Sequence, residues 1–231
     1  RSNRISLISL SRDTMCEFQR LNPDGTERDR AYGQLALAFS YGEGKEKSCE
    51  ITKDAVSRIM SELPIRSCSA LYLNGLRALN DAVGGVRVTI LEDLDYKDPA
   101  MQKGAEVTLD GRMAERYIRA RERTPQGNLN RMERQKQYVK ALMKKAMEQI
   151  KKNPESILDI YNSIKNEVVT DLTTGEMLYL ATAAANMTIA PEIRTVPGEV
   201  RMSADNYVQY DIDEAGLLEL LLSVYYIECE E

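Results

Sequence analysis

Short strand-like segments alternate with longer amphipathic segments along the whole chain, and this alternation constrains the fold more than any other feature. Residues 4–10 (RISLISL) alternate apolar and small polar side chains, which is typical of a strand with one face toward a core. The segment 48–63 instead places Ala55, Ile59 and Leu63 on one helical face, with Ser48 as the expected N-cap. Alternating strands and helices predict an α/β fold built in layers.

The same pattern continues to the end of the chain. Asn22-Pro23-Asp24-Gly25 predicts a turn, and residues 122–130 predict a loop because they are polar and contain Pro125 and Gly127. Further strands are predicted at 68–73, 86–91 and 117–121. Further helices are predicted at 74–83, from 109–111 up to the strand at 117, at 131–152, from 154, at 173–185 and from 213 onward. Without a repeat or linker, and with 231 residues, the chain is predicted to form a single domain over 1–231.

Composition excludes several classes of function. The chain contains no histidine, which removes the usual catalytic triads and most zinc sites. A net charge of −5 argues against binding to duplex nucleic acid, so none is expected as a partner. The four cysteines do not have the spacing of a metal site. They are either buried thiols or disulfides formed in an oxidising compartment.

Arginines mark the candidate site for an anion. In the predicted strand 117–121, Arg119 and Arg121 project from one face, where two guanidinium groups suit phosphate oxygens. The alternative is a solvated edge strand. Arg131 and Gln135 share a face in the first turns of the next predicted helix, where free N–H groups favour anions. The alternative for Arg131 is a charge in water.

Other charged residues of the chain are predicted to have separate roles. Arg134 is expected to be a surface residue or a partner of Glu133. Asp13 follows Arg12 at the end of the first strand, where a carboxylate can orient arginines or hold Mg²⁺. The acidic segment 92–98 lacks the spacing of a calcium loop, so a solvated loop is expected there.

The order of five short motifs resembles that of the LytR–CpsA–Psr family of cell-envelope proteins. The motifs are SLSRDT (9–14), QLALAFSYG (34–42), NDAVGGV (80–86), YIRAR (117–121) and NRMERQ (130–135). The resemblance covers roughly residues 4–185 and leaves 186–231 as a C-terminal extension. It implies a three-layer α/β/α domain with a central, mostly mixed β-sheet.

The resemblance also implies a function. Members transfer teichoic acids, capsular polysaccharides or similar glycopolymers from an undecaprenyl-pyrophosphate carrier onto peptidoglycan, with Mg²⁺ assisting. They act at the outer face of the cytoplasmic membrane of Gram-positive-type bacteria, held by an anchor upstream of the domain. By this match, Arg12, Arg119, Arg121, Arg131 and Gln135 would hold the pyrophosphate. Arg12, Asp13, Arg119 and Arg121 would be the catalytic residues, and Asp13 would be a metal ligand.

The sequence departs from the family pattern in three places. The Arg-Ser-Asp strand usually found upstream of the Arg-Asp motif is missing, because Arg1-Ser2-Asn3 lies too close to Arg12. Gln34 stands where lysine is common, and Asn128 stands where many members have Asp. Alternatives to a transferase are therefore a hydrolase of the lipid pyrophosphate and a non-catalytic polyprenyl-phosphate binding module or transcriptional attenuator.

An outer-face location favours disulfides over free thiols. Cys16 and Cys49 flank the segment after the Arg-Asp motif, and a disulfide between them is expected.

Overall fold

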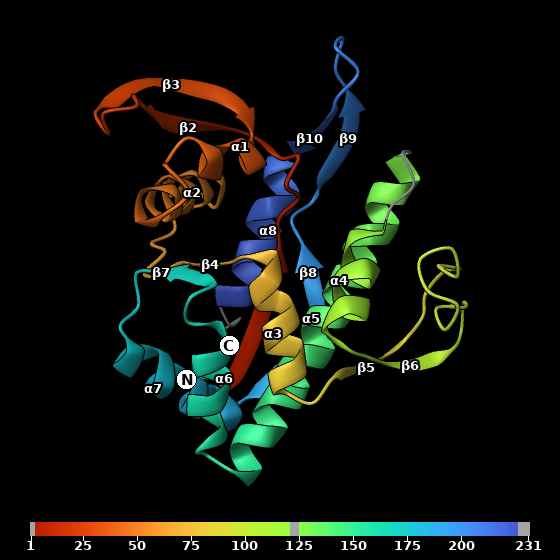
Figure 1. Ribbon diagram of the computed structural model, residues 1–231. Helices are drawn as coiled ribbons and strands as arrows, with labels where there is room; N and C mark the ends of the chain where they lie inside the picture. The colour runs from red at the N-terminus through yellow and green to blue at the C-terminus, as the bar shows by residue number, and fades with distance from the viewer. Residues whose placement is uncertain (1–2, 121–124, 226–231) are drawn as a thin grey trace, which may run out of the picture. The chain divides into compact units, whose positions relative to one another are not determined.

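The computed structural model describes residues 3–120 and 125–225, which form two compact units (Figure 1). One unit contains residues 3–5, 71–120, 125–168 and 173–191, and we refer to it as the α4 unit. The other contains residues 6–70, 169–172 and 192–225, and we refer to it as the hairpin unit. Each unit has its own apolar core, so each is described by itself.

The elements follow the alternation expected from the sequence. The helices are α1 (Leu35–Ser40), α2 (Glu46–Ile59), α3 (Leu73–Ala82), α4 (Gly111–Arg119), α5 (Pro125–Lys152), α6 (Ser156–Ile164), α7 (Thr174–Ala185) and α8 (Glu214–Tyr225). The strands are β1 (Arg4–Ser9), β2 (Met15–Leu21), β3 (Glu27–Gln34), β4 (Ser69–Leu71), β5 (Val86–Thr89), β6 (Glu106–Leu109), β7 (Val168–Thr170), β8 (Thr188–Thr195), β9 (Gly198–Met202) and β10 (Val208–Ile212).

The predicted α/β class is confirmed. Among the described residues the strands are hydrogen-bonded in pairs, namely β1 with β8, β2 with β3, β4 with β7, β5 with β6 and β9 with β10. The β2–β3, β5–β6 and β9–β10 pairs are antiparallel. Within residues 3–120 and 125–225, no helix is long and apolar enough to cross a membrane.

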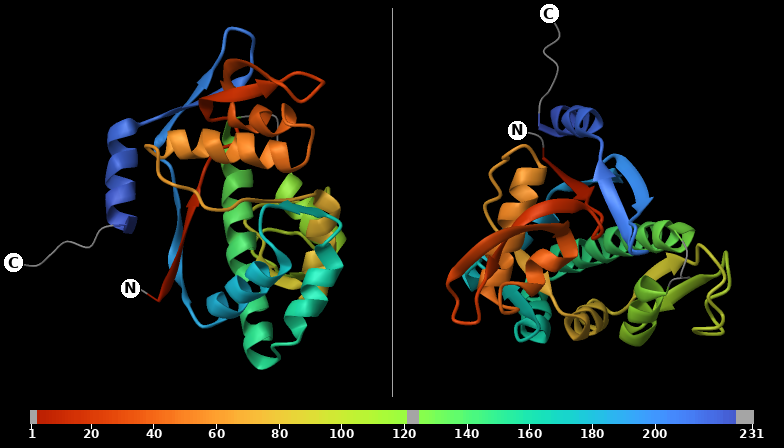
Figure 2. Two further views of the ribbon diagram at one scale, coloured as in Figure 1. Left: turned by 90° about the vertical axis from the view of Figure 1, so that its left-hand side faces the viewer. Right: turned by 90° about the horizontal axis from the view of Figure 1, so that it is seen from above.

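The core of the α4 unit lies between the β5–β6 pair and helices α3, α4 and α5. Leu109, Ala114 and Tyr117 are fully buried there, and α5 contributes Tyr138 and Leu142. A second cluster joins the C-terminal part of α5 to α6 and α7, which lie beside it in Figure 2. Because α3 packs directly against α4, the side chains on the outer faces of these two helices are brought together.

The hairpin unit is built on the β2–β3 pair and α2. The predicted turn is confirmed: Gly25 has a φ of +79°, and its N–H donates to the carbonyl of Asn22. Phe18 packs with Ile51 and Ala55 of α2 in one apolar cluster. In a second cluster, Met60 and Leu217 pack with Val196, Leu221 and partly buried neighbours. The segment predicted as a C-terminal extension thus contributes α8 to the core of this unit.

Helix α2 begins earlier than the sequence indicated. It starts at Glu46, and Lys45 is its N-cap, so the prediction that Ser48 caps the helix is wrong. The Ser48 hydroxyl instead donates to the carbonyl of Phe39 at 2.5 Å and accepts from the N–H of Gly44 at 2.8 Å. Ser48 therefore ties the start of α2 to the end of α1 from a fully buried position.

The predicted strand at 117–121 is also wrong, because α4 continues through Arg119. Ala114 and Tyr117 are three residues apart and both fully buried, which is the spacing of one helical face. The predicted loop at 122–130 is wrong from residue 125 onward, because α5 begins at Pro125, a residue tolerated in a first helical turn. Arg121 lies outside the described residues.

The disulfide expected between Cys16 and Cys49 is not present in the structure. Cys16 and Cys49 are both buried and both free. Cys16 in β2 packs among the apolar side chains around Phe18, whereas the Cys49 sulfur in α2 faces the carbonyl of Val169 at 3.7 Å. The two thiols thus have different surroundings within the hairpin unit. Cys229 lies outside the described residues.

Candidate functional site: a cationic pocket on helix α4

The candidate site is built on the outer face of α4. Asp110 caps this helix by accepting a hydrogen bond from the N–H of Met113 at 2.8 Å. With Ala114 and Tyr117 buried on the inner face, Arg112, Arg116 and Arg119 share the exposed face, because they are spaced four and three residues apart. Helical periodicity alone therefore gathers three guanidinium groups along one side of α4.

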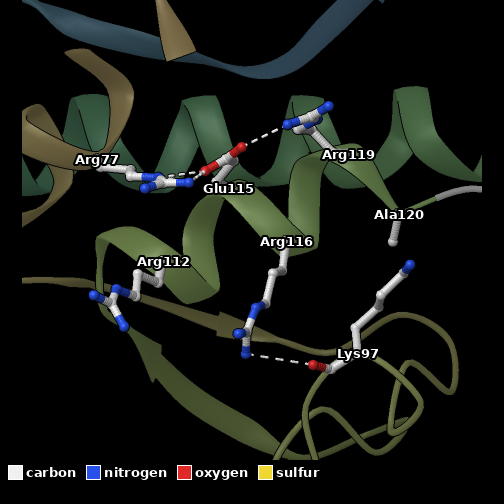
Figure 3. Close-up of a pocket in the computed structure, with 7 residues that line it drawn as sticks. All are labelled: Arg77, Lys97, Arg112, Glu115, Arg116, Arg119 and Ala120. Atoms are coloured by element: carbon white, nitrogen blue, oxygen red, sulfur yellow. Dashed lines mark hydrogen bonds and ion pairs between the residues drawn. The ribbon is translucent and has the colours of Figure 1, made fainter. Parts of the chain in front are cut away.

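Two neighbouring segments complete the pocket. Arg77 comes from α3, and Lys97 comes from the loop between β5 and β6. Together with the three arginines of α4 they line a cavity of about 560 Å³, in which Glu115 and Ala120 are the other lining residues (Figure 3). Glu115 is therefore the sole carboxylate among the lining residues.

Glu115 organises the inner side of the pocket. Its side chain is 10% exposed, and Oε1 accepts a hydrogen bond from Nη1 of Arg119 at 2.6 Å, while Oε2 is paired with Arg77 (Figure 3). The hydrogen bond from Arg119, followed by that from Arg77, holds the pKa of the Glu115 carboxyl below its usual value although burial opposes this. Glu115 is therefore ionised at neutral pH and fixes the positions of both guanidinium groups.

The other three cations of the pocket are Lys97, Arg112 and Arg116. Arg116 reaches the loop, where Nη1 lies 3.2 Å from Oδ2 of Asp98 and donates to the carbonyl of Lys97 at 3.4 Å. The Lys97 ammonium lies 5.1 Å from the ring centroid of Tyr96. Arg112 is exposed, and none of the described carboxylates forms an ion pair with it. The pocket thus has a surplus of positive charge.

This arrangement suits anion binding rather than proton transfer. Guanidinium groups stay charged at neutral pH and donate hydrogen bonds in pairs to phosphate oxygens. The single lining carboxylate is ionised and already shared between two arginines. We conclude that the pocket can hold and neutralise a phosphate-bearing ligand.

Arg134 contacts the C-terminal end of α4, beside the pocket. The prediction for this residue is wrong. It is 1% exposed, not a surface residue, and its partner is Glu92 rather than Glu133. Its Nε donates to the carbonyl of Tyr117 at 3.0 Å, and Nη2 donates to the carbonyl of Ala120. Burial lowers the pKa of Arg134 to about 10, which still leaves it charged at neutral pH. A fixed charge therefore holds the C-terminal end of α4 against α5.

Gln135 makes a similar contact. Its Nε2 donates to the carbonyl of Ile118 at 3.1 Å, so one of its amide protons is used on the backbone of α4. Arg131 lies four residues earlier in α5 and is half-buried. Because α5 begins at Pro125, Arg131 is in the second turn, and the argument from free N–H groups at a helix start does not apply to it. Its role in holding phosphate stays a prediction.

The Arg-Asp motif lies in the hairpin unit. The Asp13 carboxylate is 13% exposed, and its Oδ1 accepts from Nε2 of Gln34 at 3.1 Å and lies 3.7 Å from Nε of Arg12. The same Gln34 nitrogen donates to the carbonyl of Val208 at 2.7 Å. At the position where lysine is common, Gln34 thus anchors the Asp13 carboxylate with an uncharged amide donor. The contacts that Asp13 makes with Gln34 and Arg12 both use Oδ1 rather than Oδ2.

The predicted site residues therefore divide between the two units. Arg12 and Asp13 are neighbours in the hairpin unit, while Arg119, Arg131 and Gln135 belong to the α4 unit. Their convergence on one ligand stays a prediction. Within the described part of the chain, no group of three or more Asp, Glu or Cys side chains is arranged to hold a metal ion. The acidic loop holds Asp93 and Asp98, which bond to the N–H of Lys103 and to Arg116.

Sequence reasoning missed Arg77, Lys97, Arg112, Arg116 and Glu115. The signal for the residues of α4 was present, because residues 112, 115, 116 and 119 follow helical spacing. It was hidden when 117–121 was interpreted as a strand. Arg77 and Lys97 gave no sequence signal, because only packing of α3 and of the loop brings them to α4.

Comparison with known proteins places the chain in a family. Residues 1–222 match the model of the LytR_cpsA_psr family. The chain is 25% identical over 180 residues to the polyisoprenyl-teichoic acid–peptidoglycan teichoic acid transferase TagU of Bacillus subtilis, covering 77% of this chain and 52% of that protein. It is 35% identical over 183 residues to the TagU of Oceanobacillus iheyensis, covering 78% of this chain and 53% of the relative. The chain thus spans about half the length of these relatives.

Solved structures share the fold. Protein gbs0355 of Streptococcus agalactiae superposes with a TM-score of 0.73 at 21% identity, covering 96% of this chain and 74% of that one. B. subtilis TagU superposes with a TM-score of 0.64 at 21% identity, covering 99% and 88%. A structure of TagT bound to LI-WTA superposes with a TM-score of 0.71 at 17% identity, covering 96% and 78%. These likenesses confirm the α/β fold.

Proposed function

The chain belongs to the LytR–CpsA–Psr family, and on this basis we propose that it transfers a glycopolymer from a polyprenyl-pyrophosphate carrier onto peptidoglycan. The observation that carries the proposal is the pocket on α4, where five cations face a single lining carboxylate. A pyrophosphate joined to a glycan needs such a concentration of fixed positive charge. The curated relatives named as teichoic acid transferases support a glycopolymer as the cargo.

In the proposed reaction, a hydroxyl of peptidoglycan attacks the sugar-side phosphorus of the carrier. A phosphodiester bond forms to the acceptor, the bond to the lipid phosphate breaks, and the lipid phosphate leaves. Phosphoryl transfer of this kind depends mainly on positioning and on neutralising charge. Arg119, oriented by Glu115, would hold an oxygen of the pyrophosphate, and Arg112 and Arg116 would hold further anionic groups. The roles of Arg12, Arg121, Arg131 and Gln135 at the pyrophosphate remain part of the proposal.

Magnesium is proposed as the metal, with Asp13 as a ligand. Mg²⁺ prefers oxygen ligands and is commonly held by one or two carboxylates together with water and substrate phosphates. Asp13 fits this type of site because it is held in place through Oδ1 by Gln34, while Oδ2 makes none of those contacts. When bound, the metal would neutralise charge on the pyrophosphate.

The proposed location is the outer face of the cytoplasmic membrane in a Gram-positive-type cell wall, with peptidoglycan and the lipid-linked glycan as partners. The main support is family membership together with the names of the curated relatives, which join a polyisoprenyl carrier, teichoic acid and peptidoglycan. The proposed anchor to the membrane is a segment upstream of residue 1.

Binding of a polyprenyl pyrophosphate tests the proposal. Arg119→Ala is expected to weaken binding by roughly tenfold to a hundredfold, because a charge-assisted hydrogen bond to phosphate is lost. Arg87→Ala is the matched control, since Arg87 is an exposed arginine of the same unit that pairs with Glu106 outside the pocket. Equal affinities for the two variants and the unaltered protein would contradict the proposal.

A product assay separates the transferase from its alternatives. A lipid-linked glycan is incubated with and without peptidoglycan, and the glycan products are identified. A transferase yields glycan joined to peptidoglycan by a phosphodiester, whereas a hydrolase releases the glycan phosphate in both samples. A binding module gives no product in either sample while still retaining the lipid-linked glycan.

A further inference from the structure

Two thiols that have no part in the proposed reaction lie side by side in the hairpin unit. They are the free thiols of Cys49 in α2 and of Cys68 before β4, which are close enough to interact electrostatically. Both also contact β7 and the residue that follows it. The Cys49 sulfur lies 3.7 Å from the carbonyl of Val169, and the carbonyl of Cys68 accepts a hydrogen bond from the hydroxyl of Thr170 at 2.8 Å.

Asp171 fixes this arrangement. Its Oδ1 accepts from the backbone N–H of Cys68 at 2.9 Å, and its Oδ2 is paired with the ammonium of Lys53 at 3.0 Å. Lys53 lies four residues after Cys49, one turn further along α2. Asp171 therefore links the helix that carries one thiol to the segment that carries the other, so their closeness is built into the packing.

The two thiols differ in access. Cys49 is 4% exposed, whereas Cys68 is half-buried. Burial, followed by the interaction with Cys49, raises the pKa of Cys68 to about 12. Because the thiolate is the attacking species, the pair reacts slowly without help at neutral pH. Oxidation of the pair therefore requires a catalysed thiol–disulfide exchange. This exchange would begin at Cys68, because Cys68 is the more accessible thiol.

We propose that Cys49 and Cys68 form a disulfide bond in the working protein, made by exchange with a disulfide-bearing thiol oxidoreductase. The Cys68 thiolate attacks a sulfur of the oxidant's disulfide, giving a mixed disulfide and one oxidant thiolate. Cys49 then attacks the Cys68 sulfur and releases the second oxidant thiolate. The two cysteines lose two hydrogens and two electrons in total, and the oxidant's disulfide becomes a dithiol.

The bond would join the two ends of a segment that contains strained backbone. The segment between the two cysteines contains Ser61 and Glu62, which have positive φ values of 56° and 59° although neither is glycine. A covalent link across this segment lowers the entropy of the unfolded chain and thus favours the folded connection. The inference rests on the proposed function in one respect, because the proposed outer-face location provides the oxidising compartment in which disulfides form.

The proposal is tested on the full chain in a glutathione buffer poised to oxidise, with a disulfide oxidoreductase added. Free thiols are alkylated, the unreduced protein is cleaved with trypsin, and the peptides are identified by mass. The expected product joins Ser48–Lys53 to Ser67–Arg77, which are the tryptic peptides of the two cysteines. Alkylation of both peptides without a link, or a link of either peptide to the Cys16 or Cys229 peptide, would overturn the proposal.

A variant pair shows whether the bond also stabilises the fold. Cys68→Ser is expected to melt roughly 6–12 °C below the unaltered protein under oxidising conditions and level with it in a dithiol reductant. Cys16→Ser is the control, because Cys16 is a buried thiol of the same unit outside the pair. Peptide mapping of this control should still find the link between Cys49 and Cys68. Equal melting of Cys68→Ser and unaltered protein under both conditions would show that no stabilising bond forms.

Pyrophosphate binding, measured on the same samples, keeps the two proposals separate. If the link forms and binding is absent, the proposed function fails and the disulfide stands. If binding occurs and the link does not form, the disulfide fails alone.

Discussion

The buried guanidinium of Arg134 in α5 donates from Nε to the backbone carbonyl of Tyr117 in α4, across 3.0 Å. The last carbonyls of a helix have no partner within the helix, and here a side chain from another helix supplies one. The same guanidinium pairs with Glu92. The position of Arg119, two residues after Tyr117, therefore depends on an ion pair whose two members do not line the pocket.

We expect Arg134→Met to destabilise the protein by about 3–5 kcal/mol, because it leaves Glu92 and the carbonyls of Tyr117 and Ala120 without their buried cation. Urea unfolding measures the loss. Lys136→Met is the control, because Lys136 pairs with the exposed Glu133 and should contribute less than about 1 kcal/mol. Similar losses in the two variants would mean that Arg134 acts as an ordinary surface charge.

Gly111 sets the distance between α3 and α4. A Cβ atom at this position would lie 2.7 Å from the carbonyl oxygen of Arg77 and 2.7 Å from Oδ2 of Asp81. We expect Gly111→Ala to destabilise the protein by roughly 1–3 kcal/mol and to weaken anion binding by displacing Arg77. Gly175→Ala in α7 is the control, because its Cβ meets nothing within 4 Å. That variant should gain about 0.5–1 kcal/mol in urea unfolding, and a loss equal to that of Gly111→Ala would refute the steric explanation.

The ion pairs of Glu115 predict a pH dependence of stability. Because its folded pKa is lowered, chiefly by the hydrogen bond from Arg119, its contribution is complete above the usual glutamate value of about 4.3. It is lost as the pH falls from there through the folded pKa. Urea midpoints measured from neutral to acidic pH should therefore converge for the unaltered protein and Glu115→Gln. Acidic groups elsewhere affect both proteins alike, so a constant difference across this range would exclude Glu115 as the cause.

Asp13→Asn is expected to remove most of the Mg²⁺ dependence of polyprenyl-pyrophosphate binding, because an amide is a poorer ligand for Mg²⁺ than a carboxylate. The fold should persist, since the asparagine oxygen can still accept the hydrogen bond from Gln34. Asp24→Asn is the control, because Asp24 lies in the exposed turn of the same unit and bonds to Thr26. A titration with Mg²⁺ gives the comparison, and an unchanged midpoint for Asp13→Asn would remove this residue from the metal site.

Local signals in the sequence predicted much of the fold. The α/β alternation, the turn at Gly25 and the helix that starts after Thr173 are each governed by neighbouring residues, and each is present in the structure. The order of the motifs was enough to indicate the family. Arg119 was also identified, although for a strand rather than for the helical face that carries it.

Tertiary packing decided the rest. Arg134 looks like a surface residue in the sequence, yet it is buried because α4 ends against α5 and leaves two carbonyls for it to bind. Cys49 lies beside Cys68 because Asp171 bonds both to the N–H of Cys68, just before β4, and to Lys53 of α2. The sequence by itself determined most of the elements and the family, because both depend on residues that are neighbours along the chain. Side-chain partners depend on atoms that are distant along the chain, and only folding brings those atoms together.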